Sequence, residues 1–161
     1  MDDYRTIEIK IAKKYGAIAK GTRKSIGDFL LNDDLQKPVN VKSNNIAKNN
    51  YSPNIISAKR LIKWIENDGN ELYFLFVDYK KTEKGVEIIK ESGLVPFYHL
   101  SWNCLTIEAQ GWGVIQMPKP LEINSKQTKN DFLKGMKEAY EIYIKKETEK
   151  MIKINDMIKN F

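Results

Sequence analysis

The stretch Pro38–Ala58, PVNVKSNNIAKNNYSPNIISA, decides how the rest of the chain is interpreted. Its first part, Pro38–Ser43, is predicted to form a strand. In a strand, residues two positions apart point to the same face, so Asn40 and Lys42 share a face. The strand therefore presents an amide and an ammonium side by side.

A second strand is predicted at Ile26–Leu31, and the polar segment Asn32–Lys37 is predicted to be the turn that joins the two strands. The resulting hairpin brings Asp28 beside Asn40 and Lys42. Phosphodiester cleavage needs a cation that neutralises the phosphate and lowers the pKa of an attacking water, and that cation needs oxygen ligands. The pattern of an aspartate, eleven residues, an asparagine, one residue and a lysine meets this requirement.

Helical periodicity and capping signals predict helices at both ends of the chain and after the polar loop. The first helix is predicted at Asp3–Lys20 and ends at Gly21. The second is capped by Ser52, has Pro53 in its first turn and stops at Asn67–Gly69. One long helix or two are predicted from the capping-box residues Thr128 and Asp131 to Phe161. Further strands are predicted at Leu72–Val77, the candidate central strand, at Val86–Ile89 after a turn at Gly85, and at Phe97–Leu100, Leu105–Ala109 and Trp112–Met117.

The chain has 161 residues, of which 42% are hydrophobic, so one domain over residues 1–161 is expected. The net charge of +6 suits a polyanionic partner, although a solvated lysine face explains it equally well. The single cysteine, Cys104, cannot form an internal disulfide, and no apolar run approaches the roughly 18 residues of a membrane span. A cytoplasmic protein without signal peptide or anchor is expected.

The sequence resembles the PD-(D/E)XK restriction endonucleases, and Pro38–Ala58 looks like the catalytic and recognition segment of the HincII-type enzymes. The residues that carry this similarity are the Val-Lys strand, the Asn45-Ile46 pair, Lys48 and the unbroken block Pro53–Ala58. A looser similarity continues through Phe76–Tyr79 and Trp102. The resemblance implies an α/β fold: a single restriction-endonuclease-like domain with a mixed β-sheet flanked by helices.

The resemblance also implies residue roles. Asp28 and the residue at position 40 would bind Mg²⁺ together with the Val41 backbone carbonyl, and Lys42 would position or activate water. The implied reaction is in-line attack of water on phosphorus in double-stranded DNA, which leaves a 5′-phosphate and a 3′-hydroxyl. The implied enzyme is a type II restriction endonuclease.

Asn40 departs from the family pattern, because the family carries Asp or Glu there and an amide offers a metal only a neutral oxygen. Three explanations are open: a natural variant that tolerates the amide, a natural protein that has lost cleavage, and a deliberate substitution that traps uncleaved DNA. The hypothesis is that Asn40→Asp keeps or raises Mg²⁺-dependent cleavage.

DNA recognition in the resembling family runs through the loop after the catalytic strand. The corresponding residues here are Asn44, Asn45, Lys48, Asn49, Asn50, Tyr51 and Asn54. Asparagine pairs with adenine edges and lysine with phosphates, while the helix start predicted near Pro53 favours a phosphate. Tyr51 takes the place of a side chain that wedges between base pairs, and packing back on its own loop is the alternative.

Other assignments of the motif and the function remain open. A rival catalytic set is Asp68, Asp78 and Lys80, and Glu8 is either an accessory acidic residue or an exposed helix glutamate. A two-fold symmetric DNA site would ask for a homodimer. The alternatives to a restriction enzyme are a catalytically silent DNA-binding protein on the same fold and a repair or junction-resolving nuclease.

Overall fold

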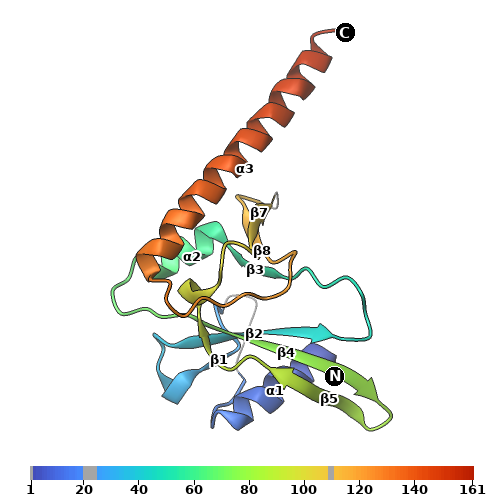
Figure 1. The fold of residues 1–161 in the computed structure, drawn as a ribbon, viewed down its shortest axis with the longest axis vertical. Helices are drawn as coiled ribbons and strands as arrows, with labels where there is room; N and C mark the ends of the chain where they lie inside the picture. Colours follow the sequence, from blue (N-terminus) through green and yellow to red (C-terminus); the bar gives the residue numbers. More distant parts are fainter. Residues whose placement is uncertain (1, 20–24, 109–110) are drawn as a thin grey trace. The chain divides into compact units, whose positions relative to one another are not determined.

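The computed structural model of the protein describes residues 2–19, 25–108 and 111–161 (Figure 1). The chain divides into two compact units, which are treated separately here. The first unit comprises Met1–Pro53 and Ile62–Phe97, and the second comprises Asn54–Leu61 and Tyr98–Phe161. A single domain over residues 1–161 stays a prediction.

The first unit is a mixed β-sheet with one helix against it. Its elements are α1 (Asp3–Lys14), β1 (Phe29–Leu30), β2 (Pro38–Asn45), β4 (Tyr73–Thr82), β5 (Gly85–Glu91) and β6 (Val95–Pro96). The strand order is β1-β2-β4-β5, and β6 also pairs with β4. β2 and β4 run parallel and the other pairs are antiparallel, so the predicted mixed sheet is confirmed.

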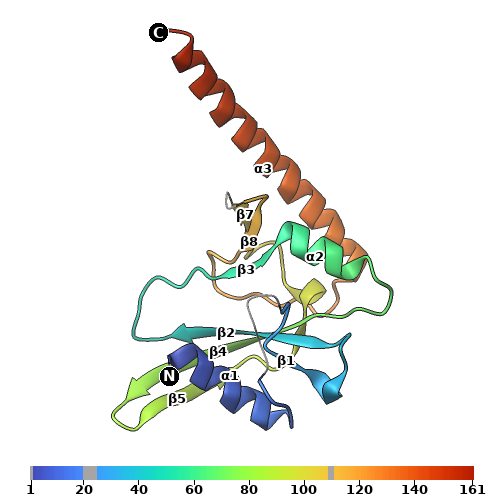
Figure 2. The same ribbon diagram turned by 180° about the vertical axis from the view of Figure 1, so that it is seen from behind.

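Helix α1 packs on this sheet through a short apolar face, and Figure 2 shows it in front of the strands, crossing their direction. Ile7, Ile11 and Ala12 are buried, in one cluster with Val39 and Val41 of β2. The helix ends earlier than the predicted Lys20, since Gly16 adopts a φ of +69° and turns the chain after Lys14. The predicted stop at Gly21 lies outside the described residues.

The hairpin that carries the candidate motif is confirmed, with a shorter first strand than predicted. Phe29 pairs with Val39 and Leu30 with Pro38 in antiparallel register. The chain then enters a 3₁₀ turn, Leu31–Asp33, in which Asn32 and Asp33 have φ values of 52° and 56°. β2 instead exceeds the prediction, because its pairing with β4 continues to Asn45.

The predicted central strand is confirmed at β4. The side chains of residues 74–77 are all buried, and the strand is paired on both edges. It runs on to Thr82, and the turn at Gly85 leads into β5 as predicted. β4 therefore provides the rigid base beside which β2 lies.

The second unit consists of a small antiparallel sheet and a long helix. The sheet has the order β3-β8-β7, from Asn54–Ser57, Val114–Gln116 and Thr106–Glu108. Helix α3, Lys129–Ile158, is one continuous helix. Its predicted capping box is confirmed: the Asp131 N–H donates to Thr128 Oγ1 at 3.1 Å, and the Asp131 carboxylate accepts from the Thr128 N–H at 3.0 Å.

The second helix is present, but its predicted start at Ser52 and Pro53 is wrong. Residues 54–57 form β3, and helix α2 spans Ala58–Ile65 with Ser57 as its cap, whose hydroxyl accepts from the Arg60 N–H at 3.1 Å. Ile55 and Ile56 are buried where β3 pairs with β8, so sheet pairing overrides the local capping signal. The phosphate-favouring helix start predicted near Pro53 is wrong for the same reason.

The later strands are shorter or shifted. Phe97–Leu100 was predicted as a strand, but Phe97–His99 form a 3₁₀ turn and the strand lies just before it, in β6. The strands predicted at Leu105–Ala109 and Trp112–Met117 shrink to β7 and β8, and Ala109 lies outside the described residues. Across residues 2–19, 25–108 and 111–161, no helix combines the length and apolar character needed to cross a membrane.

Candidate functional site

Asp28 is fixed to the edge of β2 by two hydrogen bonds. Its backbone N–H donates to the Val39 carbonyl at 2.7 Å, and its Oδ2 accepts from the Val41 N–H at 2.6 Å. Both partners are backbone groups of β2, so the carboxylate keeps its orientation without help from a flexible side chain. Asp28 thus stands directly beside the Asn40–Lys42 segment, as the hairpin predicted.

Gly27 makes this close approach sterically feasible. A Cβ at this position would lie 2.7 Å from Pro38 Cβ and 2.9 Å from the Val39 carbonyl oxygen, closer than side-chain carbons tolerate. Sequence reasoning missed this residue, although the signal was present: a glycine stands immediately before the candidate aspartate. Gly27 is a positioning residue for Asp28.

Asn40 and Lys42 point away from the face of the sheet that α1 covers, because they alternate with the buried Val39 and Val41. The positive charge of Lys42 lowers the pKa of Asp28, so the ammonium and the carboxylate are close enough to interact. The Asn40 Nδ2 donates to the Ile26 carbonyl at 3.1 Å. The structure therefore brings the predicted aspartate, amide and ammonium together at one corner of the sheet.

Glu8 of α1 interacts with Asp28 at this corner. Its side chain is 21% exposed, and the interpretation of an exposed helix glutamate does not hold. Burial raises its pKa most, followed by the negative charge of Asp28, and the two carboxyl groups share a hydrogen bond. Arg5 lies 3.3 Å from Glu8 and offsets part of this rise in the pKa of Glu8. The sequence positions of Glu8 and Asp28 do not indicate that these two side chains meet.

The Asp28 carboxyl is also harder to ionise than usual. Burial is the largest cause and raises its pKa, while the Val41 N–H and the Lys42 charge lower it without cancelling the rise. Ionising both of two half-buried carboxyl groups in contact costs free energy unless a cation binds between them. A cation bound between the two carboxyl groups would therefore favour their ionised forms.

The donor set of this corner fits a hard cation. Two carboxylates, the Asn40 amide oxygen and backbone carbonyls are all oxygen ligands, and Mg²⁺ commonly takes only one or two protein carboxylates beside substrate phosphate and water. Within the described part of the chain, no group of three or more His, Cys, Asp or Glu residues could hold a metal.

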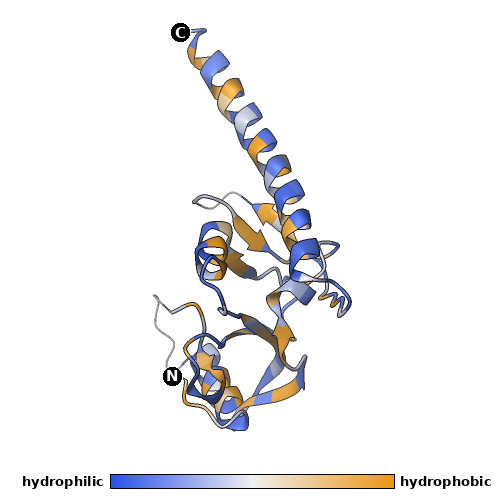
Figure 3. Cartoon of the chain, turned by 90° about the vertical axis from the view of Figure 1, so that its left-hand side faces the viewer, coloured by the Kyte–Doolittle hydropathy of each residue, from blue (hydrophilic) through white to orange (hydrophobic). Residues whose placement is uncertain are grey.

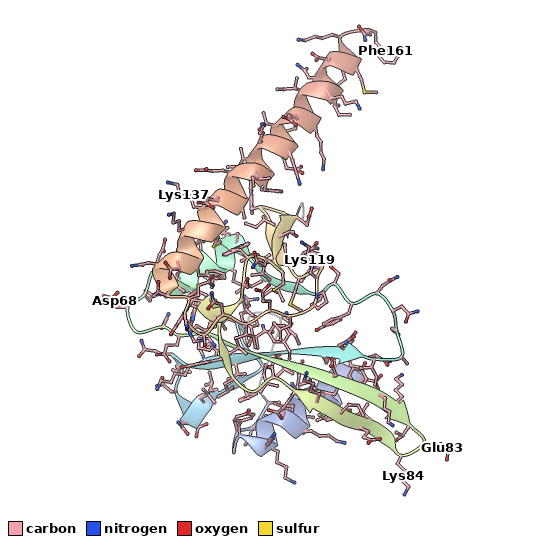
Figure 4. The ribbon with its side chains drawn as sticks, in the orientation of Figure 1. Asp68, Glu83, Lys84, Lys119, Lys137 and Phe161 are labelled. Carbon is pink, nitrogen blue, oxygen red and sulfur yellow. The ribbon has the colours of Figure 1, made fainter. Side chains whose placement is uncertain are left out.

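The rival set of Asp68, Asp78 and Lys80 is not brought together in this way. Asp78 Oδ1 accepts from the Asn44 Nδ2 at 3.0 Å, while Lys80 forms an ion pair of 3.6 Å with Glu87. Asp68 is exposed in the loop before β4, and Figure 4 shows it at the opposite end of this strand from the β4–β5 turn. Asp68, Asp78 and Lys80 therefore do not form one common site.

The residues predicted to contact DNA differ in how far they reach solvent. Lys48, Asn49, Asn50 and Asn54 are exposed, whereas Asn44, Asn45 and Tyr51 are half-buried. The Asn45 side chain accepts from the Ala47 N–H at 3.1 Å, which holds the start of the loop in a tight turn. In the second unit, Asn54 Oδ1 accepts from Gln116 Nε2 at 2.6 Å.

The hydroxyl end of the Tyr51 side chain points into the protein. The hydroxyl is buried and lacks a hydrogen-bond partner among the described residues, and burial together with Asp78 raises its pKa. This arrangement favours the interpretation in which Tyr51 packs back on its own region. A wedge role for Tyr51 stays a prediction.

Comparison with known proteins gives a fold and no closer relationship. No protein-family model and no curated protein matches the sequence. Among solved structures, the chain is similar to the NlaIV restriction endonuclease, with 15% identity, a TM-score of 0.59, and coverage of 86% of this chain. The chain spans 65% of the length of that neighbour. The similarity shows that the predicted restriction-endonuclease-like α/β fold is correct, and the HincII-type subclass stays a prediction.

Proposed function

We propose that this protein is a Mg²⁺-dependent type II restriction endonuclease that hydrolyses phosphodiester bonds of double-stranded DNA at a specific sequence. The observation that carries the proposal is the corner of the first unit: an aspartate locked to β2, with a second carboxyl group and an ammonium beside it. The fold is one that a restriction endonuclease also uses.

Asp28 and Glu8 would hold the cation through their carboxylates, and Asn40 Oδ1 and the Val41 carbonyl would complete the protein ligands. When bound, Mg²⁺ neutralises the phosphate and lowers the pKa of a coordinated water. The Asn40 Nδ2 donates to the Ile26 carbonyl, so Oδ1 is the atom of this side chain that would serve as a ligand. This neutral ligand makes Glu8 the second acidic group of the site.

The remaining chemistry falls to Lys42 and to the fixed geometry. The Lys42 ammonium positions the attacking water and stabilises the negative charge that develops on the phosphate oxygens. Asp28 keeps its orientation through the Val41 N–H. In-line attack of water then leaves a 5′-phosphate and a 3′-hydroxyl.

Double-stranded DNA is the proposed partner, in a cytoplasmic restriction-modification system. The net charge of +6 favours a polyanion, and the exposed Lys48, Asn49 and Asn50 provide the residue types that meet phosphates and base edges. A homodimer with two catalytic centres would match a two-fold symmetric DNA site.

A silent DNA-binding protein is the second candidate, favoured by one observation. The Asn40 amide is satisfied by the Ile26 carbonyl, an interaction that the usual carboxylate could not make. The amide therefore belongs to the local structure, and a chain that binds DNA without cutting it would retain the same bond.

The test is digestion of long natural DNA with Mg²⁺, followed by sequencing of the ends. We expect discrete ends carrying 5′-phosphates, and we expect Asp28→Asn to abolish them while the matched variant Asp78→Asn leaves them unchanged. Heterogeneous ends would support a repair or junction-resolving nuclease instead. Specific binding with no cleavage, or equal cleavage by Asp28→Asn, would overturn the proposal.

A further inference from the structure

A row of three polar residues crosses the small sheet of the second unit. Gln116 of β8 lies directly opposite Asn54 of β3 on one side and Thr106 of β7 on the other. Residues directly opposite each other in antiparallel strands share a face of the sheet, so the three side chains lie on one face. The next row along the strands is apolar and buried, and its members are Ile56, Ile115 and Ile107.

Helix α3 covers the apolar face within the same unit. Ile107, Tyr140 and Tyr143 converge on Gly113, where a Cβ would lie 3.1 Å from the first two and 3.3 Å from the third. Figure 3 shows apolar residues in the strands beside the lower part of α3. Because successive residues of a strand point to opposite faces, the polar row lies on the face that α3 does not cover.

The two amides of the polar row are hydrogen-bonded to each other. Gln116 Nε2 donates to Asn54 Oδ1 at 2.6 Å, which uses one of its two hydrogens. Gln116 Oε1 accepts no hydrogen bond from the described residues. The Thr106 hydroxyl is buried and has no hydrogen-bond partner among them. Asn54 therefore fixes the orientation of the Gln116 amide, and one acceptor and one donor of this amide stay available.

An amide held in this way is complementary to the edge of an adenine. In the major groove adenine presents its N6 amino group as a donor and N7 as an acceptor, and glutamine can pair with both. Guanine offers two acceptors there and cytosine a donor, so neither matches both groups of the amide. A two-stranded β-ribbon fits into the major groove, and β3 with β8 forms such a ribbon.

We propose that Gln116 reads an adenine in the major groove and that Asn54 holds the Gln116 amide in the reading orientation. Oε1 accepts from adenine N6, and the second hydrogen of Nε2 is donated to N7. The inference rests on the proposed function, because it names a specificity-determining residue for the same DNA substrate. Asn54 was predicted from the sequence to contact DNA, whereas Gln116, 62 positions away, meets it only through the pairing of β3 with β8.

The test is selection of bound sequences from a random DNA library by the full chain, with Ca²⁺ in place of Mg²⁺. We expect the parent chain to select a consensus that contains an adenine, and we expect Gln116→Leu to lower the preference for this base by about 10-fold or more. Preferences at the other positions should stay the same. Thr106→Val is the matched control, because it removes a buried hydroxyl from the same row and should leave the consensus unchanged.

Two further substitutions change the chemistry of the amide pair. A carboxylate only accepts hydrogen bonds, which suits the N4 amino group of cytosine, so Gln116→Glu should change the preferred base from adenine to cytosine. Asn54→Asp keeps an acceptor for Gln116 Nε2 and should retain the preference for adenine, whereas Asn54→Leu should lose it. A role of Asn54 in folding alone would not change the preference at one base.

The outcomes separate this inference from the proposed function. An unchanged consensus for Gln116→Leu and Gln116→Glu, or a parent chain that binds DNA without base preference, overturns the inference. If Gln116→Leu loses its fold by circular dichroism, Gln116→Glu decides. A parent chain that selects a consensus and never cuts it overturns the proposed function alone. A parent chain that binds no DNA overturns both.

Discussion

A carboxylate lies beside each end of β2, and the two carboxylates have different neighbours. At the far end, Asp78 of β4 accepts a hydrogen bond from Asn44, a neutral amide that satisfies one oxygen. At the near end, Asp28 meets the Glu8 carboxyl and the Lys42 charge. An amide stabilises a carboxylate without competing for protons, whereas a second carboxyl group makes ionisation harder. Under the proposed function the near end would hold the cation, whereas Asp78 at the far end forms a structural hydrogen bond.

The largest expected effect comes from removing the ammonium at the near end. Lys42→Met should lower the cleavage rate by roughly 100-fold or more, since the charge that positions water and stabilises the phosphate oxygens is lost. The matched change Lys80→Met removes a lysine that is paired with Glu87 on the surface. Single-turnover cleavage assays should show no loss for Lys80→Met, and equal losses in both variants would break the comparison.

Glu8→Gln should change the cleavage rate and the pH dependence of stability in ways that can be measured separately. Without a second carboxylate for the cation, we expect cleavage at fixed Mg²⁺ to fall by about 10-fold or more. The pKa values of Glu8 and Asp28 are raised above 4.5 and 3.8, so in that window the folded protein binds more protons than the unfolded chain. Stability of the metal-free protein therefore falls as pH rises through these raised pKa values.

The measurement for Glu8→Gln is thermal unfolding without metal from pH about 4 to about 8, the range in which such carboxyl groups titrate. The variant should lose less stability with rising pH than the parent chain. A parent chain whose stability rises steadily through this range, with an identical profile for the variant, would contradict the pairing of Glu8 with Asp28.

Asn40→Asp sharpens the comparison by giving the near end a third acidic group. The carboxylate would face the Ile26 carbonyl in place of the amide donor, so metal-free stability should drop by about 1–3 kcal/mol. Mg²⁺-dependent cleavage should be kept or raised, because a charged ligand binds the cation better than an amide. Urea unfolding and plasmid cleavage measure the two effects, and a clear loss of cleavage would argue against the site.

The smallest effect is expected at the far end of β2. Asn44→Ala removes the amide that donates to Asp78 and should cost about 1 kcal/mol of stability. The single-turnover cleavage rate at saturating DNA should fall far less than for Lys42→Met, because Asn44 lies outside the Asp28 corner. A loss of cleavage as large as that of Lys42→Met would erase the distinction between the two ends.

The hairpin that carries Asp28, Asn40 and Lys42 could be predicted from sequence because its signals are local. Alternation around Asn40 and Lys42, a polar turn and a second strand are enough to bring Asp28 to them. The central strand at β4 and the Thr128 capping box were predictable for the same reason. Each of these features depends on residues that are close together in the chain.

The features that escaped prediction depend on contacts between distant residues. Ser52 and Pro53 look like a helix start, but the pairing of Ile56 with Ile115 of β8 makes a strand of residues 54–57. Glu8 enters the site only because α1 packs on β2, a contact that no spacing reveals. Tertiary packing decided both cases against the local pattern.

The central proposal is that the Asp28 corner binds a divalent cation. Mn²⁺ binding to the protein alone, followed by electron paramagnetic resonance, tests this directly. The parent chain and Asp78→Asn should bind Mn²⁺ with the same affinity, and Asp28→Asn and Glu8→Gln should bind it much more weakly. Binding by Asp28→Asn that equals that of the parent chain would contradict the account.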